Sequence, residues 1–236
     1  MPNNKNPLAE VFGYVISNTD QKVIKLRKKK ICPFKNKFKK CTKDKLDNPL
    51  GVCSIYSHND TAIICPVRFK ENWVIAKDAA KFFFPDKTNW KIIPEVKLLD
   101  ANGNTAGNVD YVLVRLDSKG KIIDFGSLEV QSVYISGNLR APFKKYMKDQ
   151  DKDFTWSTTN LYPKPDYLSS SRKRLVPQII YKGKIFNDWG KKAVVCIQKS
   201  FFETLPKFRS VDEKDGEAAW FIYDLIFNKE QNKYIL

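Results

Sequence analysis

Histidine is almost absent from this chain, which contains a single one, His58, among 236 residues. A single histidine argues against HNH-type sites and phospholipase-like sites with paired histidines, and a Ser-His-Asp triad would have to use His58 itself. We interpret residues 58–60 as a turn. The glycine-rich phosphate loop of nucleotide-hydrolysing enzymes is also absent. Hydrolysis by a metal ion held on carboxylates is the chemistry that these absences leave.

Long apolar segments are missing too. None approaches the ~18 residues of a membrane-spanning helix, and no signal peptide is visible. We therefore expect a soluble, intracellular protein. With 42% hydrophobic and 13% aromatic residues, the chain can form a sizeable core. Its length suits one domain, or a compact domain with a smaller module.

Positive charge, in contrast, is abundant. The 42 lysines and arginines exceed the 26 acidic residues by 16, and they are spread along the chain. This excess favours a polyanionic partner. A membrane surface and a ribosomal-type role are alternatives, but the many acids and the long apolar strands favour an enzyme. The basic run at 27–30 is either a solvated helix end or a phosphate contact.

Residues 94–132 predict three consecutive strands that bring acidic side chains together. The strands are expected at 95–99, 109–116 and 121–133, with a tight turn at Asn102-Gly103 after the first. Asp110 lies near the start of the second strand. Because strand side chains alternate between the two faces, Glu129 and Gln131 share one face of the third.

These side chains suit a metal-dependent phosphodiesterase. Mg²⁺ prefers carboxylate and water oxygens, and such an ion supplies both a nucleophilic water and charge stabilisation. We expect Asp110 and Glu129 to hold the ion, Glu95 to reach it or a second ion, and the Gln131 amide to orient the water. The alternative is a meander with three exposed acids and an amide, because the spacing is a loose pattern.

Four of the five cysteines cluster in a loop-rich segment, at Cys32, Cys41, Cys53 and Cys65. Intracellular proteins rarely keep such thiols as disulfides, whereas four tetrahedral thiolates suit Zn²⁺ or iron. The spacing lacks C-x2-C pairs and does not identify the ion. Four unrelated thiols are the alternative. Cys196 lies in an apolar strand predicted at 193–198, and we expect it to be a buried structural thiol.

Several segments resemble the cysteine-bearing region of NotI-type restriction endonucleases. They are Ile31-Cys32-Pro33-Phe34, Lys40-Cys41-Thr42-Lys43, Pro49-Leu50-Gly51-Val52-Cys53-Ser54, Cys65-Pro66-Val67-Arg68-Phe69 and Asp78-Ala79-Ala80-Lys81-Phe82-Phe83-Phe84. The acids of the three predicted strands match as well. The similarity runs from about residue 10 to residue 131 and, more loosely, to the C-terminus.

The resemblance implies an activity and its cofactors. Enzymes of this type are PD-(D/E)xK nucleases with Gln in place of Lys, and they cleave duplex DNA as homodimers with Mg²⁺. Their catalytic set corresponds to Glu95, Asp110, Glu129 and Gln131. Their single iron ion corresponds to a site on Cys32, Cys41, Cys53 and Cys65, with zinc as the alternative. A restriction enzyme further implies a prokaryotic cytoplasm and a cognate DNA methyltransferase that acts on the same site without needing to bind the protein.

Basic residues beyond the catalytic strands are candidates for DNA contact. The polar segment 149–171, between helices expected at 142–148 and 175–186, is the best candidate for a DNA-facing loop. Arginine commonly reads guanine because its fork matches O6 and N7. A solvated basic turn is the alternative. The candidates are Arg140, Lys144, Lys145, Arg172, Lys173 and Arg174.

The remaining elements complete the predicted fold. Helices are expected at 8–12, from about residue 18, at 76–84 and near Phe201, and a last strand at 218–227. We predict an α/β fold of the PD-(D/E)xK restriction-endonuclease type, a mixed sheet flanked by helices. A four-cysteine metal module would occupy residues 1–70 and the nuclease core residues 71–236.

The predicted function is a type II restriction endonuclease that makes sequence-specific, Mg²⁺-dependent double-strand cuts in DNA. Two alternatives are open. One is a repair or mobile-element nuclease of the same fold. The other is a non-catalytic DNA-binding protein that uses the cysteine module and the basic surface alone.

Overall fold

A computed structural model describes residues 6–35, 39–57, 60–156, 161–207 and 209–236. The chain forms two compact units, each assembled from segments that are distant in sequence. Unit 1 comprises residues 1–72, 132–167 and 224–236, and unit 2 comprises 73–131 and 168–223. The sequence assigned 71–236 to the nuclease core as one piece, whereas its segments 132–167 and 224–236 pack with the N-terminal unit.

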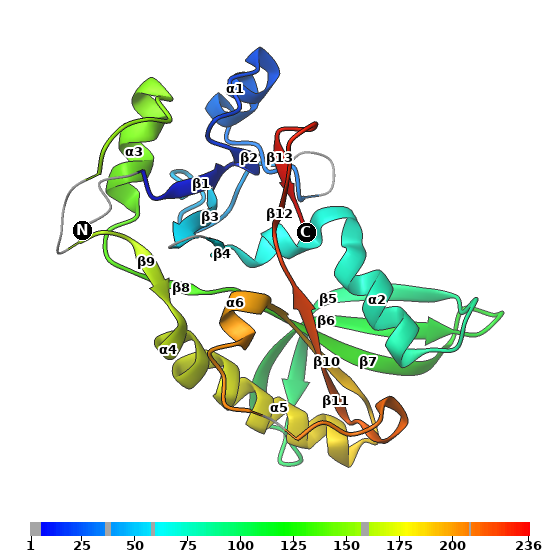
Figure 1. Cartoon of the computed structure of the whole chain (residues 1–236). Coiled ribbons are helices and arrows are strands. Elements are labelled where there is room, and N and C mark those ends of the chain that lie inside the picture. Colours follow the sequence, from blue (N-terminus) through cyan, green and yellow to red (C-terminus); the bar gives the residue numbers. More distant parts are fainter. Residues whose placement is uncertain (1–5, 36–38, 58–59, 157–160, 208) are drawn as a thin grey trace. The chain divides into compact units, whose positions relative to one another are not determined.

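Unit 2 is built on a five-stranded sheet of order β11-β10-β7-β6-β5 (Figure 1). Its strands are β5 (Trp90–Leu99), β6 (Thr105–Leu116), β7 (Ile122–Gln131), β10 (Ala193–Gln198) and β11 (Ala218–Tyr223). The pairs β5–β6 and β6–β7 are antiparallel, whereas β10 runs parallel to both β7 and β11. The prediction of an α/β fold with a mixed sheet is confirmed.

Helices pack on both faces of this sheet (Figure 1). Phe83 of α2 (Val74–Phe83) lies so close to β7 that a Cβ atom on Gly126 would be 2.6 Å from its ring. Phe186 of α5 (Val176–Asp188) packs edge-on against Phe125 of β7. Because side chains alternate along a strand, Phe125 and Glu129 point to the α5 face, and Gly126 points to the α2 face. Any site built on Glu129 therefore opens toward α5.

Unit 1 contains a four-stranded antiparallel sheet of order β2-β1-β3-β4. Its strands are β1 (Leu8–Val11), β2 (Tyr14–Val15), β3 (Val52–Ser57) and β4 (Asp60–Ile63). The prediction of a helix at 8–12 is wrong. All four residues of β1 are buried, Glu10 included. A short segment that is covered on both sides suits an internal strand as well as a helix. Gly13, at φ +78°, then turns the chain into β2.

A buried charge network in unit 1 explains the acid inside β1. The Glu10 carboxylate accepts hydrogen bonds from the Ser54 hydroxyl (2.7 Å) and from Arg68 Nε (3.0 Å). The Arg68 guanidinium also donates to Glu71 and to the carbonyl of Tyr234 in β13 (Lys233–Ile235). A buried ion pair persists where its remaining donors and acceptors are satisfied in this way.

The predicted helices from about residue 18, at 142–148, at 175–186 and near Phe201 are present with shifted ends, and the short strands β8 (Tyr134–Ser136), β9 (Lys164–Asp166) and β13 were not predicted. Unit 1 contains α1 (Gln21–Lys28), α3 (Arg140–Asp149), the pair β8 and β9, and the pair β12 (Ile226–Asn228) and β13. The helical segment that ends with α5 begins earlier than predicted. It starts with α4 (Tyr167–Ser170) and continues through a π-helical segment at Ser171–Leu175 into α5. α6 spans Lys199–Phe202. The strand predicted at 218–227 is interrupted and forms β11 and β12.

Some predicted features fall outside the described residues, namely part of the turn at 58–60 and residues 157–160 of the polar segment. None of the helices in the described ranges is long and apolar enough to cross a membrane.

Candidate active site and cysteine cluster

Three acids form a row across neighbouring strands of unit 2. The antiparallel register between β5 and β6 is the same on both sides of Glu95 and places it opposite Asp110. The register between β6 and β7 pairs Tyr111 with Leu128, so the next position of β6 places Asp110 opposite Glu129. We call Glu95, Asp110 and Glu129 the acid row. The two sequence features that predicted this row, the strand meander and the period-2 alternation of side chains, are both local.

Asp110 and Glu129 contact each other directly. Asp110 Oδ2 accepts a hydrogen bond from the backbone N–H of Val130 at 2.8 Å, which ties the carboxylate to β7. Burial, followed by the charge of Asp110, raises the pKa of Glu129 to about 7. In its protonated form Glu129 donates a hydrogen bond to Asp110. Two carboxyl groups this close repel when both are ionised, and a divalent cation between them relieves that repulsion.

Glu95 lies on the edge strand in an unusual backbone conformation. Its φ is +53°, in the left-handed region that costs a residue with a side chain on the order of 1–3 kcal/mol. The side chain is exposed, and together with Asp110 its charge acts on the buried Tyr111 phenol, whose pKa is raised by burial first and by both acids next. Glu95 is therefore near Asp110 and open to solvent, which suits an accessory ligand.

Gln131 lies two residues beyond Glu129, on the same face of β7, and is 9% exposed. Its backbone pairs with Ile197 of β10. A carboxamide has both donors and an acceptor but carries no charge and takes no proton from water. At this position it can orient a water molecule. Positive charge at the site must come from other groups, because the amide is neutral.

Lys182 reaches the acid row from α5, and the sequence reasoning missed it. Its Nζ lies 2.8 Å from Glu129 Oε1 and donates a second hydrogen bond to the carbonyl of Asn108 at 2.5 Å. The charged side chains of Lys182 and Glu129 are 8% and 14% exposed. In the sequence, Lys182 stands four residues before Phe186, a spacing that puts both side chains on one side of a helix. Phe186 is buried, so Lys182 faces the sheet as well.

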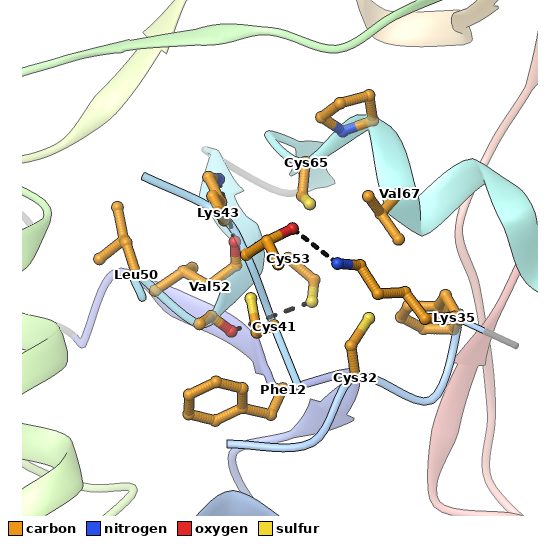
Figure 2. A pocket seen from close by; sticks show the side chains of 14 residues that line it. Phe12, Cys32, Lys35, Cys41, Lys43, Leu50, Val52, Cys53, Cys65 and Val67 are labelled. Carbon is orange, nitrogen blue, oxygen red and sulfur yellow. Dashed lines mark hydrogen bonds between the residues drawn. The ribbon is translucent and has the colours of Figure 1, made fainter. Parts of the chain in front are cut away.

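The four clustered cysteines line one cavity of about 250 Å³ in unit 1. Cys53 lies on β3, Cys65 follows β4, and Cys32 and Cys41 lie beside a short bridge between Ile31 and Lys40. All four side chains are buried, at 5–8% exposure. Figure 2 shows their sulfur atoms turned toward the same central space.

The environment of these thiols is apolar, crowded with sulfur and flanked by cations. Burial first, with contributions from Cys65 and Cys41, raises the pKa of Cys32 to about 11, and burial raises the pKa of Cys53 well above its usual value. Half-buried Lys43 lies among the cysteines and donates to the carbonyls of Val52 (3.0 Å) and Ile64 (2.8 Å). Burial lowers the pKa of Lys43, and the charges of the surrounding cysteines oppose that shift.

A metal fits the chemistry of this donor set. Thiols held protonated by burial become ligands when an ion displaces their protons, and a divalent ion with four thiolates carries a net negative charge that Lys43 offsets. Among the described residues, however, no group of three or more Cys, His, Asp or Glu side chains is arranged so that it could hold a metal ion. Cys196, by contrast, is fully buried in β10, as expected of a structural thiol.

The predicted DNA-contacting residues fall on two surfaces, one in each unit. In unit 1, Lys144 and Lys145 of α3 are exposed, whereas the Arg140 guanidinium pairs with Asp44 and donates to the carbonyl of Asn48. Arg140 therefore has a structural role, and its contact with DNA stays a prediction. In unit 2, the π-helical segment carries exposed cations at Arg172, Lys173 and Arg174.

Comparison with protein-family models identifies the family of this chain. The model of the family described as restriction endonuclease NotI matches residues 10–236, nearly the whole chain. No curated protein sequence matches. The matched range includes the acid row, Gln131 and all four clustered cysteines.

Proposed function

Because the chain belongs to the restriction endonuclease NotI family, we propose that it is a type II enzyme that makes sequence-specific, Mg²⁺-dependent double-strand cuts. Family membership makes the chain a restriction endonuclease, a nuclease that acts on double-stranded DNA. Mg²⁺-dependent cleavage is supported by the contact between Asp110 and Glu129 within the acid row.

Each residue of the site has a role that follows from its position. Asp110 and Glu129 would hold the catalytic Mg²⁺, and exposed Glu95 would complete its coordination or hold a second ion. Bound there, Mg²⁺ supplies charge stabilisation and a water activated for attack on phosphorus. The Gln131 amide, on the same face of β7, would orient that water. Val130 fixes Asp110 through its backbone N–H, so this ligand is preorganised.

The cysteine cluster would hold a structural metal, iron by the family resemblance and zinc by the same donor set. Four thiolates saturate a tetrahedral ion and leave no position open for chemistry. The cysteines around the cavity come from β3, from the segment after β4 and from the loops around Cys32 and Cys41. A metal bound to them would join these segments and stabilise the fold of unit 1. The donor set, the burial and the neighbouring Lys43 support this part of the proposal.

The enzyme would act as a homodimer, because two active sites are needed to cut both strands of a duplex. Two subunits related by a two-fold axis match a palindromic site. The exposed side of α4 and α5 carries apolar side chains that a monomer gains nothing from exposing. They are Leu168, Val176, Ile180 and Tyr181, of which Ile180 and Tyr181 are each 65% exposed. The cognate methyltransferase would protect the same DNA site without binding this protein.

Digestion of a large plasmid with Mg²⁺, followed by sequencing of the fragment ends, tests the proposal. The wild-type protein should give discrete fragments with one terminal sequence, and Glu129→Ala should bind DNA while cutting at least ~100-fold more slowly. Asp86→Ala, which removes an exposed acid in the turn after α2, is the matched control and should cut normally. Cleavage by Glu129→Ala at the wild-type rate, or cutting confined to branched DNA, would overturn the proposal.

A further inference from the structure

α5 presents a lysine where a helix on a sheet normally presents an apolar side chain. Lys182 is 6% exposed and lies one helical turn before Phe186, which is 2% exposed, so both face the sheet. Ile180 and Tyr181 of the same helix are solvent-exposed. Burying a lysine is unfavourable unless its charge is paired and hydrogen-bonded. The inverted pattern indicates that the ammonium group is kept at this place for what it contacts.

What it contacts is the centre of the acid row. The ammonium group of Lys182 has three N–H donors. One is directed to Glu129 Oε1 and one to the carbonyl of Asn108 on β6. Those two anchors, on neighbouring strands, fix the position of Nζ. Because Nζ bonds to Glu129, it lies on the face of β7 that also carries Gln131, and the ammonium group has a third N–H with which to bind a phosphoryl oxygen.

The reaction at such a site requires positive charge besides the metal. Negative charge accumulates on the phosphoryl oxygens in the transition state, and lysine or arginine side chains stabilise it. In the acid row and at Gln131, the sheet supplies carboxylates and one neutral amide. Among the cations of the described residues, Lys182 is the one that forms an ion pair with an acid of this row.

We propose that Lys182 is a catalytic residue that stabilises the scissile phosphate from α5, supplying the charge that Gln131 lacks. This inference rests on the proposed nuclease function and assigns a further residue to the same site. In the reaction, a bond forms between the water oxygen and phosphorus, and one phosphorus–oxygen ester bond breaks. The water gives up one proton to solvent, and the departing alcohol oxygen takes one up. Lys182 donates a hydrogen bond to a phosphoryl oxygen throughout and keeps its protons.

Exchanging the two side chains separates a catalytic role from a structural one. Lys182→Gln removes the charge but keeps an amide that can donate to Glu129. Gln131→Lys returns an ammonium group to the same face from β7, two residues from Glu129. The exchange variant, Lys182→Gln with Gln131→Lys, therefore restores the positive charge at the site from β7 instead of α5. Lys184→Met is the control, because Lys184 is exposed and pairs with Asp188 on the outer side of α5.

The readouts are the single-turnover cleavage rate on a plasmid with Mg²⁺, the Kd for DNA without Mg²⁺, and the unfolding temperature. Lys182→Gln should cut about 100-fold more slowly, with little change in DNA affinity, and Lys184→Met should cut normally. The exchange variant should recover at least about tenfold of the lost rate. A Lys182→Gln protein that cuts within about threefold of wild type overturns the inference, as does a slow variant whose rate the exchange does not raise.

Two further comparisons keep the test decisive. If Lys182→Gln is unfolded at the assay temperature, Lys182→Arg, which keeps the charge, takes its place. It should retain at least about a tenth of the wild-type rate, and loss of cleavage in a folded Lys182→Arg protein contradicts the inference. Failure of the proposed function itself looks different, because wild-type protein would then not cut with Mg²⁺ or Glu129→Ala would cut normally.

Discussion

Asp110 and Glu129 lie opposite each other on β6 and β7, and their carboxyl groups contact each other while Lys182 pairs with Glu129 on its other side. In the absence of a metal, this arrangement holds a proton that an isolated glutamate would lose. Under the proposed function, a metal ion would displace that proton, and such perturbed pairs of titratable groups are typical of functional sites.

The first prediction concerns the pH dependence of stability without metal. The pKa of Glu129 rises from the ordinary 4.5 to about 7 in the folded state. The folded protein therefore binds a proton more tightly than the unfolded chain between these values. The stability contribution is complete below about pH 4.5 and is lost as pH rises through 7, with an upper bound of about 3 kcal/mol. Chemical denaturation of metal-free protein at pH 5.5 and 8 measures it, and Glu129→Gln should lessen the difference. Equal slopes in both proteins would exclude Glu129 as the source.

Asp110→Asn should change stability and activity in opposite directions. The substitution removes the charge that raises the pKa of Glu129 but keeps an oxygen to accept the Val130 N–H. At pH 8 without metal, the variant should be more stable than wild type by about 1 kcal/mol. With Mg²⁺ it should cut at least ~100-fold more slowly, since a metal ligand is lost. Thermal unfolding and plasmid cleavage measure the two effects. A variant that is less stable and fully active would contradict both assignments.

The cysteine cluster predicts a bound metal with a recognisable colour. Purified protein should be reddish and show thiolate-to-iron charge-transfer absorption, and elemental analysis should find one ion per chain. Cys53→Ala should lose the metal and unfold at a lower temperature, because binding energy of a structural metal is folding energy. Cys196→Ala, a buried cysteine in β10, is the control: it should keep the metal whatever its effect on packing. Colourless protein with stoichiometric zinc would change the ion and keep the site; no metal in freshly purified protein would remove the site.

The apolar side of α4 and α5 predicts where two subunits meet. Ile180→Lys replaces one of the most exposed of these apolar side chains by a charge and should convert a dimer into a monomer in light-scattering measurements. The monomer should nick plasmid DNA rather than linearise it. Val211→Lys, at an exposed valine of unit 2 outside these helices, should remain dimeric. A monomeric wild-type protein, or a dimeric Ile180→Lys protein, would place the interface elsewhere.

Local patterns predicted much of the fold and of the site. The meander that carries Asp110 and Glu129 consists of strands joined by short turns, so alternation and turn residues suffice to place the acids on one face. The strand at Ala193–Gln198 is found at the predicted residues, because a short β-branched run between polar flanks has few other solutions.

Features that depend on tertiary contacts were harder to predict. Lys182 approaches Glu129 from a helix far along the chain, and a lysine in an amphipathic segment is usually assigned to the solvent side. Residues 8–12 were assigned to a helix because so short a segment does not reveal that sheet neighbours will bury both of its sides, Glu10 included. Arg140 looked like a free cation in sequence, and its pairing with Asp44 is a contact between distant segments of unit 1.

Diffraction from crystals of the protein with duplex DNA and Mn²⁺ in place of Mg²⁺ tests the central claim most directly, because anomalous scattering locates the ion. We predict an anomalous peak within ligating distance of both Asp110 and Glu129, next to a DNA phosphate, with Lys182 still beside Glu129. A cleaved duplex whose scissile phosphate lies away from the acid row, with no ion between these two carboxylates, would contradict it.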